Sequence, residues 1–347
     1  MPAIHRSAAI AVLGALATVT ALSACGNNSN PGPASTVTVT PTTSGASPSA
    51  GAAAVTPPAM VAVTNAGALV TLNPATGSVT RTLVSAHVLG DEVSVSSTGM
   101  VYFAVRHGCA DEVEAIPVAG GSVTEIAPGT LPAVSPDGTK LAYAEEPSLS
   151  IGCVPGTGDP VLLYHLDIRT LSSGLTSKLP MVPTGQSSGL PAPISHLSWA
   201  SDNDHLAVSI SAVQDNEGWN LAIVDTAQAQ YYLSGTGVTF VPVTGPGKLR
   251  SYLREGVYMP TGALFVSRAC CAGFPVRNTS RLMWEVSTAG ALIHQVAVGY
   301  ISLDHTSLDV SSDGGWLLYL AGDSLYVSQG GATPRELTTG LIAAAWG

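Results

Sequence analysis

The sequence predicts an all-β fold, a six-bladed β-propeller with four-stranded blades that is closed by the C-terminal strand joining the N-terminal blade. The first reason is a repeat: an apolar segment, a tight turn and a second apolar segment recur at residues 91–106, 131–145, 194–210 and 306–322. β-Type units that recur every 40 to 60 residues, roughly, are typical of propellers. The second reason is that the two ends of the chain carry incomplete units that complement each other.

The turns of the repeat have a local physical cause, which is clearest in Ser135-Pro136-Asp137-Gly138. Pro136 fixes φ at the first central position, Asp137 suits the second, and Gly138 takes a conformation that is unfavourable for residues with a Cβ. Such a turn joins two antiparallel strands. The apolar run that follows it, residues 141–143, is typical of a strand buried on both faces between neighbouring blades.

Second hairpins complete the units. A strand, a polar turn and another strand are predicted within each of residues 111–126, 161–179, 220–233, 281–298 and 324–337. With the first hairpins they give five four-stranded units, one of which has residues 258–262 in place of the standard turn.

The remaining segments predict how the ring closes. Residues 341–346 resemble a first strand without a partner, whereas residues 59–84 resemble three strands without a first strand. Joining them gives a sixth blade and removes the sheet edges that an unclosed array would expose.

The Ser-Pro-Asp-Gly turn, the Leu-Ala-Tyr run after it and the Leu-Tyr-x-x-Asp pattern at residues 163–167 resemble the TolB-like (WD40-like) six-bladed β-propeller family. The resemblance covers residues 59–347, and only the turn at residues 135–138 matches the family pattern fully. It implies the propeller fold. Family members include envelope scaffold proteins and the propeller domains of prolyl-oligopeptidase-like enzymes, so the resemblance leaves the function open.

Residues 1–24 are predicted to be a lipoprotein signal peptide. A basic start precedes an apolar stretch at residues 8–22, which is short for a membrane span. The tetrapeptide Leu-Ser-Ala-Cys that ends at Cys25 resembles the bacterial lipobox, whose cysteine is diacylated and becomes the mature N-terminus. We therefore expect a protein anchored to the cell membrane by lipid and facing the extracellular side.

The segment after the lipobox is predicted to be a disordered tether. Residues 25–57 are rich in Ser, Thr, Pro and Ala, and residues 26–57 carry no charged side chain. The folded domain then spans residues 58–347. The net charge of −10 and the lack of a basic cluster argue against nucleic acid as a partner and against direct adhesion to anionic lipid. We expect a monomer.

Four cysteines besides Cys25 are expected to form disulfides, because an even number in an oxidising exterior favours pairing. Three connectivities are possible. Cys109 and Cys153 occupy equivalent loops of adjacent blades, and Cys270 and Cys271 share the same kind of loop further round. This placement favours Cys109 with Cys153 and Cys270 with Cys271, while the absence of a C-x-x-C spacing disfavours zinc.

Two other motif matches carry little weight. Residues 185–189 match G-x-S-x-G, but prolines flank them where a nucleophile elbow needs a strand and a helix. Residues 202–204 and 215–218 offer oxygen ligands for Ca²⁺, yet neither segment has the ligand count of an EF-hand loop, so ordinary turns are preferred. No catalytic residue is predicted from these motifs.

One polar group deserves a functional interpretation. Aligning the blades on their turns places Glu92, His196 and Glu255 at the same position of the innermost strands beside the central channel, with Asp309 two residues beyond that position. Two carboxylates and one imidazole could hold Ca²⁺ or Zn²⁺ and polarise an ester or lactone. The alternative is a hydrated polar channel without a cofactor.

Two functions therefore remain. The first is a non-enzymatic binding or scaffold module for an envelope protein, a peptide or a glycan, with a recognition face formed by loops that present Arg106, His107, Trp219, Arg268 and Arg277. The alternative is a metal-dependent extracellular hydrolase or lactonase with its site at the mouth of the channel. The first needs no cofactor, and the second needs Ca²⁺ or Zn²⁺.

Overall fold

A computed structural model describes residues 58–108, 110–145, 165–181, 194–210, 220–242, 251–270, 281–299, 307–330 and 332–347. Every regular element in these ranges is a β-strand, and the strands form six antiparallel sheets of four strands each. The ranges contain no helix with the length and apolar character that crossing a membrane requires. The predicted signal peptide, tether and Cys25 lie outside them.

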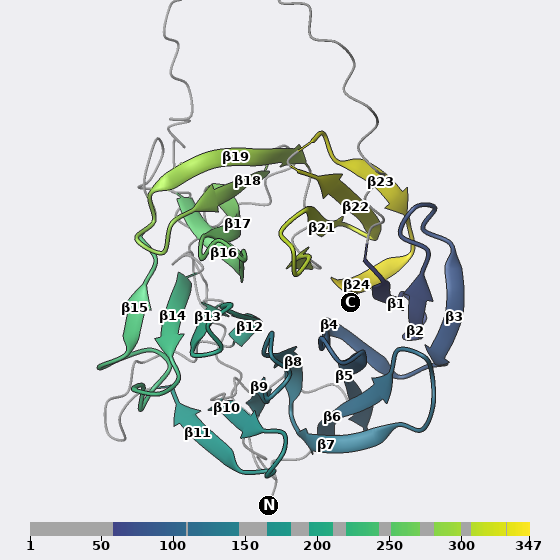
Figure 1. Cartoon of the computed structure of the whole chain (residues 1–347), viewed down its shortest axis with the longest axis horizontal. Helices are drawn as coiled ribbons and strands as arrows, with labels where there is room; N and C mark the ends of the chain where they lie inside the picture. Colours follow the sequence, from purple (N-terminus) through teal and green to yellow (C-terminus); the bar gives the residue numbers. More distant parts are fainter. Residues whose placement is uncertain are drawn as a thin grey trace, which may run out of the picture. The chain divides into compact units, whose positions relative to one another are not determined.

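The six sheets stand radially around a central axis, with β4, β8, β12, β16 and β24 nearest the centre (Figure 1). From the inside outward, blade 1 contains β24 (Leu341–Trp346), β1 (Met60–Thr64), β2 (Leu69–Leu72) and β3 (Val79–Val84). Blade 2 contains β4 (Val88–Val95), β5 (Met100–His107), β6 (Ala110–Pro117) and β7 (Thr124–Pro128). Blade 3 contains β8 (Thr130–Val134), β9 (Lys140–Glu145), β10 (His165–Thr170) and β11 (Thr176–Pro180).

The other three blades repeat this order. Blade 4 contains β12 (Ile194–Trp199), β13 (His205–Ile210), β14 (Asn220–Asp225) and β15 (Val238–Phe240). Blade 5 contains β16 (Ser251–Tyr258), β17 (Leu264–Cys270), β18 (Arg281–Val286) and β19 (Leu292–Gly299). Blade 6 contains β20 (Leu308–Val310), β21 (Trp316–Ala321), β22 (Ser324–Gln329) and β23 (Arg335–Thr338). The predicted six-bladed propeller is therefore confirmed.

The two ends of the domain meet in blade 1, as predicted. Strand β24 pairs antiparallel with β1, with Met60 opposite Trp346 and Val63 opposite Ala343. The Trp346 ring also lies 6.0 Å from the Trp316 ring of blade 6, measured between ring centroids. The closing strand thus joins its own blade by backbone pairing and the preceding blade by side-chain packing.

The repeated turns form by the predicted mechanism. The Ser135 hydroxyl donates to Asp137 Oδ1 at 2.6 Å and accepts the Lys140 N–H at 2.9 Å, while Gly138 holds a φ of 70°. The divergent turn of blade 4 places Asn203 at this left-handed position, with a φ of 61°. Asn tolerates that conformation better than other residues with a Cβ, which explains why the turn persists without the glycine.

Each strand in the middle of a blade is buried on both faces. In β5, Phe103 packs in one cluster with Val61 of blade 1, and the adjacent Tyr102 packs in another with Leu141 of blade 3. Successive side chains of a strand point to opposite faces, so one strand joins two interfaces between blades. This double burial is the reason for the continuous apolar runs in the sequence.

The outer hairpin of blade 4 differs from the prediction. Both strands of this hairpin were predicted within residues 220–233, but the outer strand is β15, after a longer connection. Tyr232 is instead fully buried in the core cluster that joins blades 3 and 4, and its N–H donates to the Pro180 carbonyl oxygen at 3.1 Å. The apolar residues there pack between two blades and do not form a strand.

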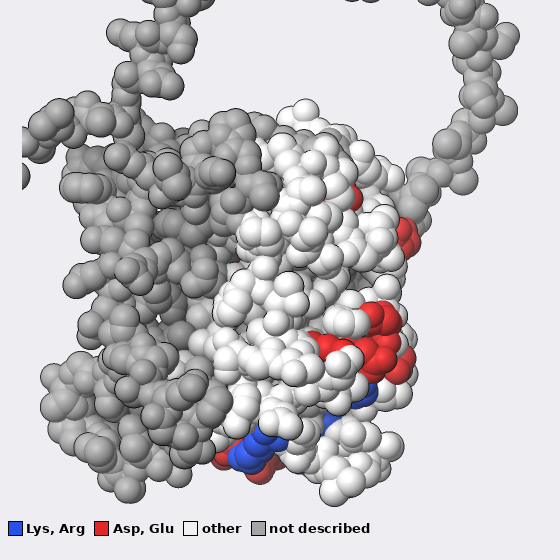
Figure 2. All heavy atoms as spheres, turned by 90° about the vertical axis from the view of Figure 1, so that its left-hand side faces the viewer, with Lys and Arg blue, Asp and Glu red and all other residues white. Residues whose placement is uncertain are grey.

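The ring has two different ends. The connections between the first and second strands, at residues 96–99, 135–139, 200–204, 259–263 and 311–315, lie at one end, which we call the turn end. The hairpins between the second and third strands lie at the opposite end, the loop end, because each antiparallel strand crosses its blade once. The part of the surface that is described in Figure 2 is mostly uncharged.

Candidate binding site in the central channel

A cavity of about 480 Å³ occupies the central channel. It runs from Glu92 and His196, within the innermost strands, to the turns of the turn end, where Ser97 and Ser312 contribute to its wall. Residues of all six blades line it. Glu92 was expected where its innermost strand begins, but β4 begins four residues earlier at Val88, so Glu92 lies within the strand and the cavity extends from it toward the turn end.

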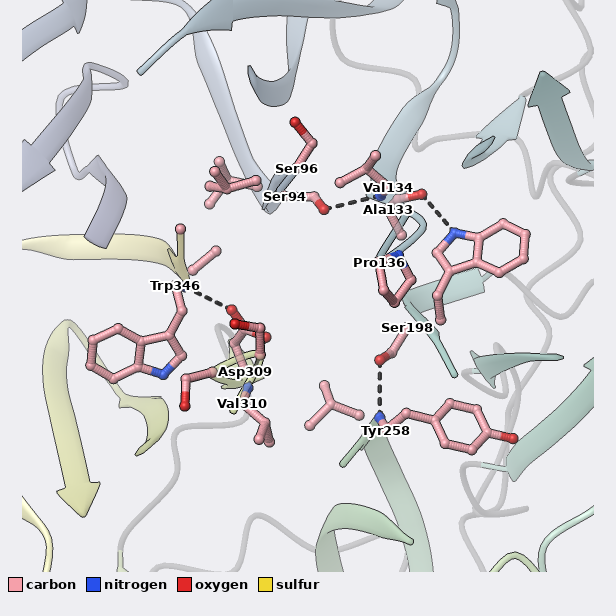
Figure 3. Close-up of a pocket in the computed structure, with 18 of the residues that line it drawn as sticks. Ser94, Ser96, Ala133, Val134, Pro136, Ser198, Tyr258, Asp309, Val310 and Trp346 are labelled. Atoms are coloured by element: carbon pink, nitrogen blue, oxygen red, sulfur yellow. Dashed lines mark hydrogen bonds between the residues drawn. The ribbon is translucent and has the colours of Figure 1, made fainter. Parts of the chain in front are cut away.

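The wall of the cavity alternates between polar and apolar side chains from blade to blade. At one position of the innermost strand, blades 2, 4 and 6 have polar residues, which are Ser94, Ser198 and Asp309. At the same position, blades 3, 5 and 1 have apolar residues, which are Ala133, Val257 and Ala345. The cavity therefore has an approximate threefold pattern within a sixfold ring (Figure 3).

Each of the three polar side chains accepts a hydrogen bond from the backbone of the next blade, as the dashed lines in Figure 3 show. The bonds are Val134 N–H to Ser94 Oγ at 3.0 Å, Tyr258 N–H to Ser198 Oγ at 3.0 Å and Trp346 N–H to Asp309 Oδ2 at 2.7 Å. These donors belong to β8, β16 and β24, which are terminal strands of their sheets. The bonds link neighbouring blades and also cap N–H groups on sheet edges that face the channel.

Asp309 gives the cavity its most unusual electrostatic feature. Its Oδ1 accepts a second hydrogen bond, from the Val310 N–H at 2.8 Å. Both N–H donors favour the ionised carboxylate, yet burial outweighs them and raises the pKa of Asp309 to about 7. Among the described residues that line the cavity there is no Lys or Arg, so no side chain on its wall carries a permanent positive charge.

Glu92 and His196, which were predicted to lie together beside the channel, are neighbours at the inner end of the cavity. Glu92 Oε1 lies 3.6 Å from His196 Nδ1, and Glu92 Oε2 accepts the Leu197 N–H at 3.3 Å. The two residues come from blades 2 and 4, with the apolar Leu131 of blade 3 at the equivalent position. Burial lowers the pKa of His196 to about 4, so its imidazole is neutral at pH 7.

The third predicted metal ligand does not join them. Glu255 is buried in β16 and is not among the residues that line the cavity. Within the described ranges, a single set of three side chains brings potential ligand atoms within 4.8 Å of one another: His107, Glu112 and Glu114. His107 Nε2 lies 3.3 Å from Glu114 Oε1 and 3.9 Å from Glu112 Oε2.

This second group lies at the loop end of blade 2, on the β5–β6 hairpin. The antiparallel register places Glu112 opposite Val105 and Glu114 opposite Phe103, so both carboxylates share the face of His107. Motif searching missed it because the residues alternate along two strands and do not follow the helical H-x-x-x-H spacing. Alternation with a period of two across a predicted hairpin is the signal that could have found it.

The other predicted recognition residues are only partly described. Arg106 lies at the loop end, where its guanidinium forms a two-pronged ion pair with Asp111, at 2.7 Å from Nε to Oδ1 and 2.9 Å from Nη2 to Oδ2. Arg268 and Cys270 lie in β17, and nothing about their side chains is described. The remaining predicted residues lie outside the described ranges: Cys25, Cys109, Cys153, Trp219, Cys271 and Arg277. The disulfide pairing stays a prediction.

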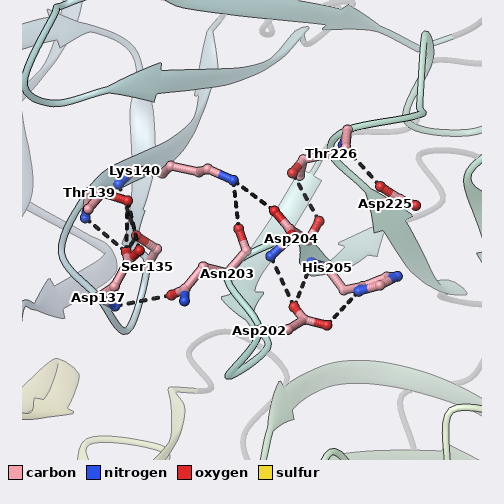
Figure 4. Close-up of polar contacts among 11 residues, drawn as sticks. Ser135, Asp137, Thr139, Lys140, Asp202, Asn203, Asp204, His205, Asp225 and Thr226 are labelled. Carbon is pink, nitrogen blue, oxygen red and sulfur yellow. Dashed lines mark hydrogen bonds and ion pairs between the residues drawn. The ribbon is translucent and has the colours of Figure 1, made fainter.

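Residues 202–204, considered for Ca²⁺, form a turn that joins blades 3 and 4 (Figure 4). Lys140 Nζ donates to the Asn203 carbonyl oxygen at 2.8 Å and to Asp204 Oδ1 at 3.0 Å. The Asp137 N–H donates to Asn203 Oδ1 at 3.1 Å. The polar side chains of this turn thus connect two blades, in agreement with the preferred interpretation.

Comparisons with known proteins agree with the fold. No family model matches the sequence, and no curated protein has a matching sequence. Among solved structures, TolB from Acinetobacter baumannii aligns with a TM-score of 0.56 and 12% identity over 83% of this chain and 65% of that one, so this chain spans just under two thirds of that TolB. A putative TolB from Agrobacterium tumefaciens gives a TM-score of 0.51 and 12% identity over 82% and 90% of the two chains.

A putative 6-phosphogluconolactonase from Bacteroides fragilis is more distant, with a TM-score of 0.45 and 12% identity over 85% of this chain and 99% of that one. At that distance it carries no argument about activity. The TolB likenesses are also remote in sequence, and they show the fold alone. By its blade number, strand order and closure, the chain has the fold of a TolB-like six-bladed β-propeller.

Proposed function

We propose that this chain is a lipid-anchored, extracytoplasmic binding module that takes a segment of an envelope glycan or peptide into its central cavity and performs no chemistry on it. The observation that carries the proposal is the cavity of about 480 Å³, walled by serine hydroxyls and apolar side chains. Ligand pockets generally have volumes of about 300 to 1,000 Å³ and a few polar groups on an apolar wall. A cavity of this size is too small for a folded protein, so a partner protein could place only a segment of its chain in it.

The hydrolase alternative has less support. A metal-dependent lactonase at this position would need Glu92, His196 and Glu255 to converge on one ion, and Glu255 does not line the cavity. The contact between Glu92 and His196 is the observation in its favour. Metal analysis of purified protein separates the two functions, since a stoichiometric Ca²⁺ or Zn²⁺ that is lost in Glu255→Ala would favour the enzyme.

Blocking the cavity tests the binding function. Ser97→Trp places a large side chain at the turn end of the cavity on an exposed turn, so it should obstruct entry with little effect on folding. Ser173→Trp makes the same change on the exposed β10–β11 turn, whose residues do not line the cavity, and is the matched control.

The probes are a muramidase digest of peptidoglycan and a tryptic digest of envelope proteins, passed over immobilised protein. We expect the wild type and Ser173→Trp to retain components that Ser97→Trp retains at least tenfold less, measured by mass spectrometry of the eluates. Equal retention by Ser97→Trp, or no retention by the wild type from either digest, would contradict the proposed function.

The lipid anchor has its own test. Cys25→Ser removes the thiol that would be acylated, and we expect the protein to move from the detergent phase to the aqueous phase on Triton X-114 partitioning of cells. Ser23→Ala keeps a small residue at this position before the cysteine and should leave the protein in the detergent phase. A Cys25→Ser protein that stays with the detergent would show that another feature holds it at the membrane.

A further inference from the structure

Side-chain oxygens cap several backbone N–H groups on the innermost strands of this propeller. Besides the three N–H groups capped by Ser94, Ser198 and Asp309, side-chain oxygens accept the N–H groups of Leu197, Gly256, Val310 and Ala344. A peptide that binds by adding a strand to a sheet edge needs such N–H groups free. The edges of β8, β12, β16, β20 and β24 are therefore partly blocked for this mode of recognition.

The side chains, in contrast, keep hydrogen-bonding capacity. The hydroxyls of Ser94 and Ser198 each accept one N–H, and neither is bonded to any other group in the described part of the chain. Each retains its O–H hydrogen as a donor, and acceptance of a hydrogen bond strengthens that donor. Asp309 adds carboxyl oxygens as acceptors.

The arrangement matches the chemistry of a sugar ring. Sugar hydroxyls both donate and accept, and they alternate around the ring with C–H groups. The cavity wall alternates in the same way, with polar groups on blades 2, 4 and 6 and Ala133, Val257 and Ala345 between them. A ring ligand across the channel would meet both kinds of surface in turn.

The charged side chains on the cavity wall disfavour sugars that carry a negative charge. Glu92 and Asp309 line the cavity, and its described lining residues include no Lys or Arg. A carboxylate or phosphate on the ligand would lose its hydration without gaining a cationic partner. A neutral hydroxyl has no charge to desolvate, and a protonated amine can exchange its hydration for contacts with carboxyl groups on the wall.

We propose that the cavity binds a sugar residue without negative charge, either neutral or amine-bearing, whose hydroxyl groups accept hydrogen bonds from Ser94 and Ser198 and donate to Asp309. This inference rests on the proposed function and specifies its ligand. A peptide is the competing class, and it enters the experiment as a possible outcome.

The test uses the full-length chain in detergent and saturation-transfer NMR. The probes are glucose, galactose and mannose, each together with its 2-amino form and its uronic acid. We expect at least one neutral sugar or 2-amino sugar to bind, with the matching uronic acid at least tenfold weaker. The inference is overturned if no neutral sugar and no 2-amino sugar binds, or if a uronic acid binds equally well.

Two variants separate a direct contact from an effect on folding. Ser94→Ala removes the proposed donor and the cap on Val134, and should weaken sugar binding at least tenfold. Ser209→Ala removes a comparable cap, since Ser209 Oγ accepts the Gly256 N–H at 3.3 Å, but Ser209 does not line the cavity. Sugar binding should survive in Ser209→Ala, and equal loss in both variants would contradict the contact.

The failure of this inference can be told apart from the failure of the proposed function. If Ser97→Trp abolishes retention of tryptic peptides while no sugar binds, the cavity is a binding site and only the ligand class is wrong. If a sugar binds equally to the wild type and Ser97→Trp, its site lies elsewhere and both proposals fall.

Discussion

Two titratable side chains beside the central channel have pKa values displaced in opposite directions, to about 4 for His196 and about 7 for Asp309. Below about pH 6.5 the unfolded chain takes up a proton at His196 that the folded chain accepts only near pH 4, so this residue lowers the free energy of unfolding as the pH falls. Asp309 acts in the opposite sense. Between about pH 4 and 7 the folded chain keeps a proton that the unfolded chain releases, so its stabilising contribution is lost as the pH rises through this window.

Replacing Asp309 by Ser should therefore change how stability depends on pH. The serine hydroxyl can still accept the Trp346 N–H, as Ser94 and Ser198 do for their neighbours. Relative to the wild type, the free energy of unfolding of Asp309→Ser should rise by about 2 to 4 kcal/mol between pH 4 and pH 7. Urea denaturation across that range measures it. Asp167, whose pKa burial also raises to about 7, is present in both proteins and cancels in the comparison.

Some residues of the channel site are predictable from the sequence alone. Aligning the blades on their turns places Glu92, His196 and Asp309 beside the channel. These residues stand out because ionisable side chains are rare in buried strands. The same alignment puts Ser94 and Ser198 at the position of Asp309. A single serine carries no chemical signal, so this position is informative only when its equivalents in all six blades are compared.

At the scale of the structural element, the turn of blade 4 combines backbone strain with a contact to blade 3. Asn203 holds a φ of 61° and accepts the Asp137 N–H. Asn203→Ala should lower the free energy of unfolding by about 1 to 2 kcal/mol, because alanine is strained at positive φ and loses the hydrogen bond. Asn203→Gly removes only the hydrogen bond and should cost less. Guanidinium denaturation measures both, and an alanine variant as stable as the glycine variant would contradict the strain.

The elements were predictable to the extent that local chemistry determines them. Turns such as residues 135–138 and hairpins such as β5–β6 follow from turn residues and apolar runs that act within a few positions. Tyr232 shows the limit. It is buried among residues of blades 3 and 4, and its N–H donates to the Pro180 carbonyl oxygen of blade 3. Contacts of that kind leave no trace in the local pattern, which therefore predicts a strand where the structure has a buried connection.

At the scale of the whole molecule, stability depends on the closing strand. Deleting residues 341–347 removes the partner of β1, the buried Trp346 and the N–H that Asp309 accepts. We expect loss of the cooperative thermal transition, or a melting temperature lower by more than about 10 °C, in circular dichroism. Deleting residues 30–50 of the predicted tether removes more of the chain and should leave the melting temperature unchanged. A truncated chain that melts like the wild type would be incompatible with this closure.

The closure itself was the most predictable long-range feature, since two incomplete units at opposite ends of one chain have a single complementary solution. The group at His107, Glu112 and Glu114 was not predictable from motifs, because only the register of β5 against β6 brings it together. Global symmetry can thus be read from repeats, whereas a small polar cluster depends on the pairing of individual residues.

The pairing of β1 with β24 also has a consequence for biogenesis. Until β24 docks, β1 has no neighbour on its inner side, and the incomplete ring is an open template for another chain. The vulnerable stage therefore ends only when the last strand of the domain pairs with its first. Because the chain is predicted to be exported, this stage would follow translocation, and a chaperone that shields the incomplete ring there would raise the yield without any change in sequence.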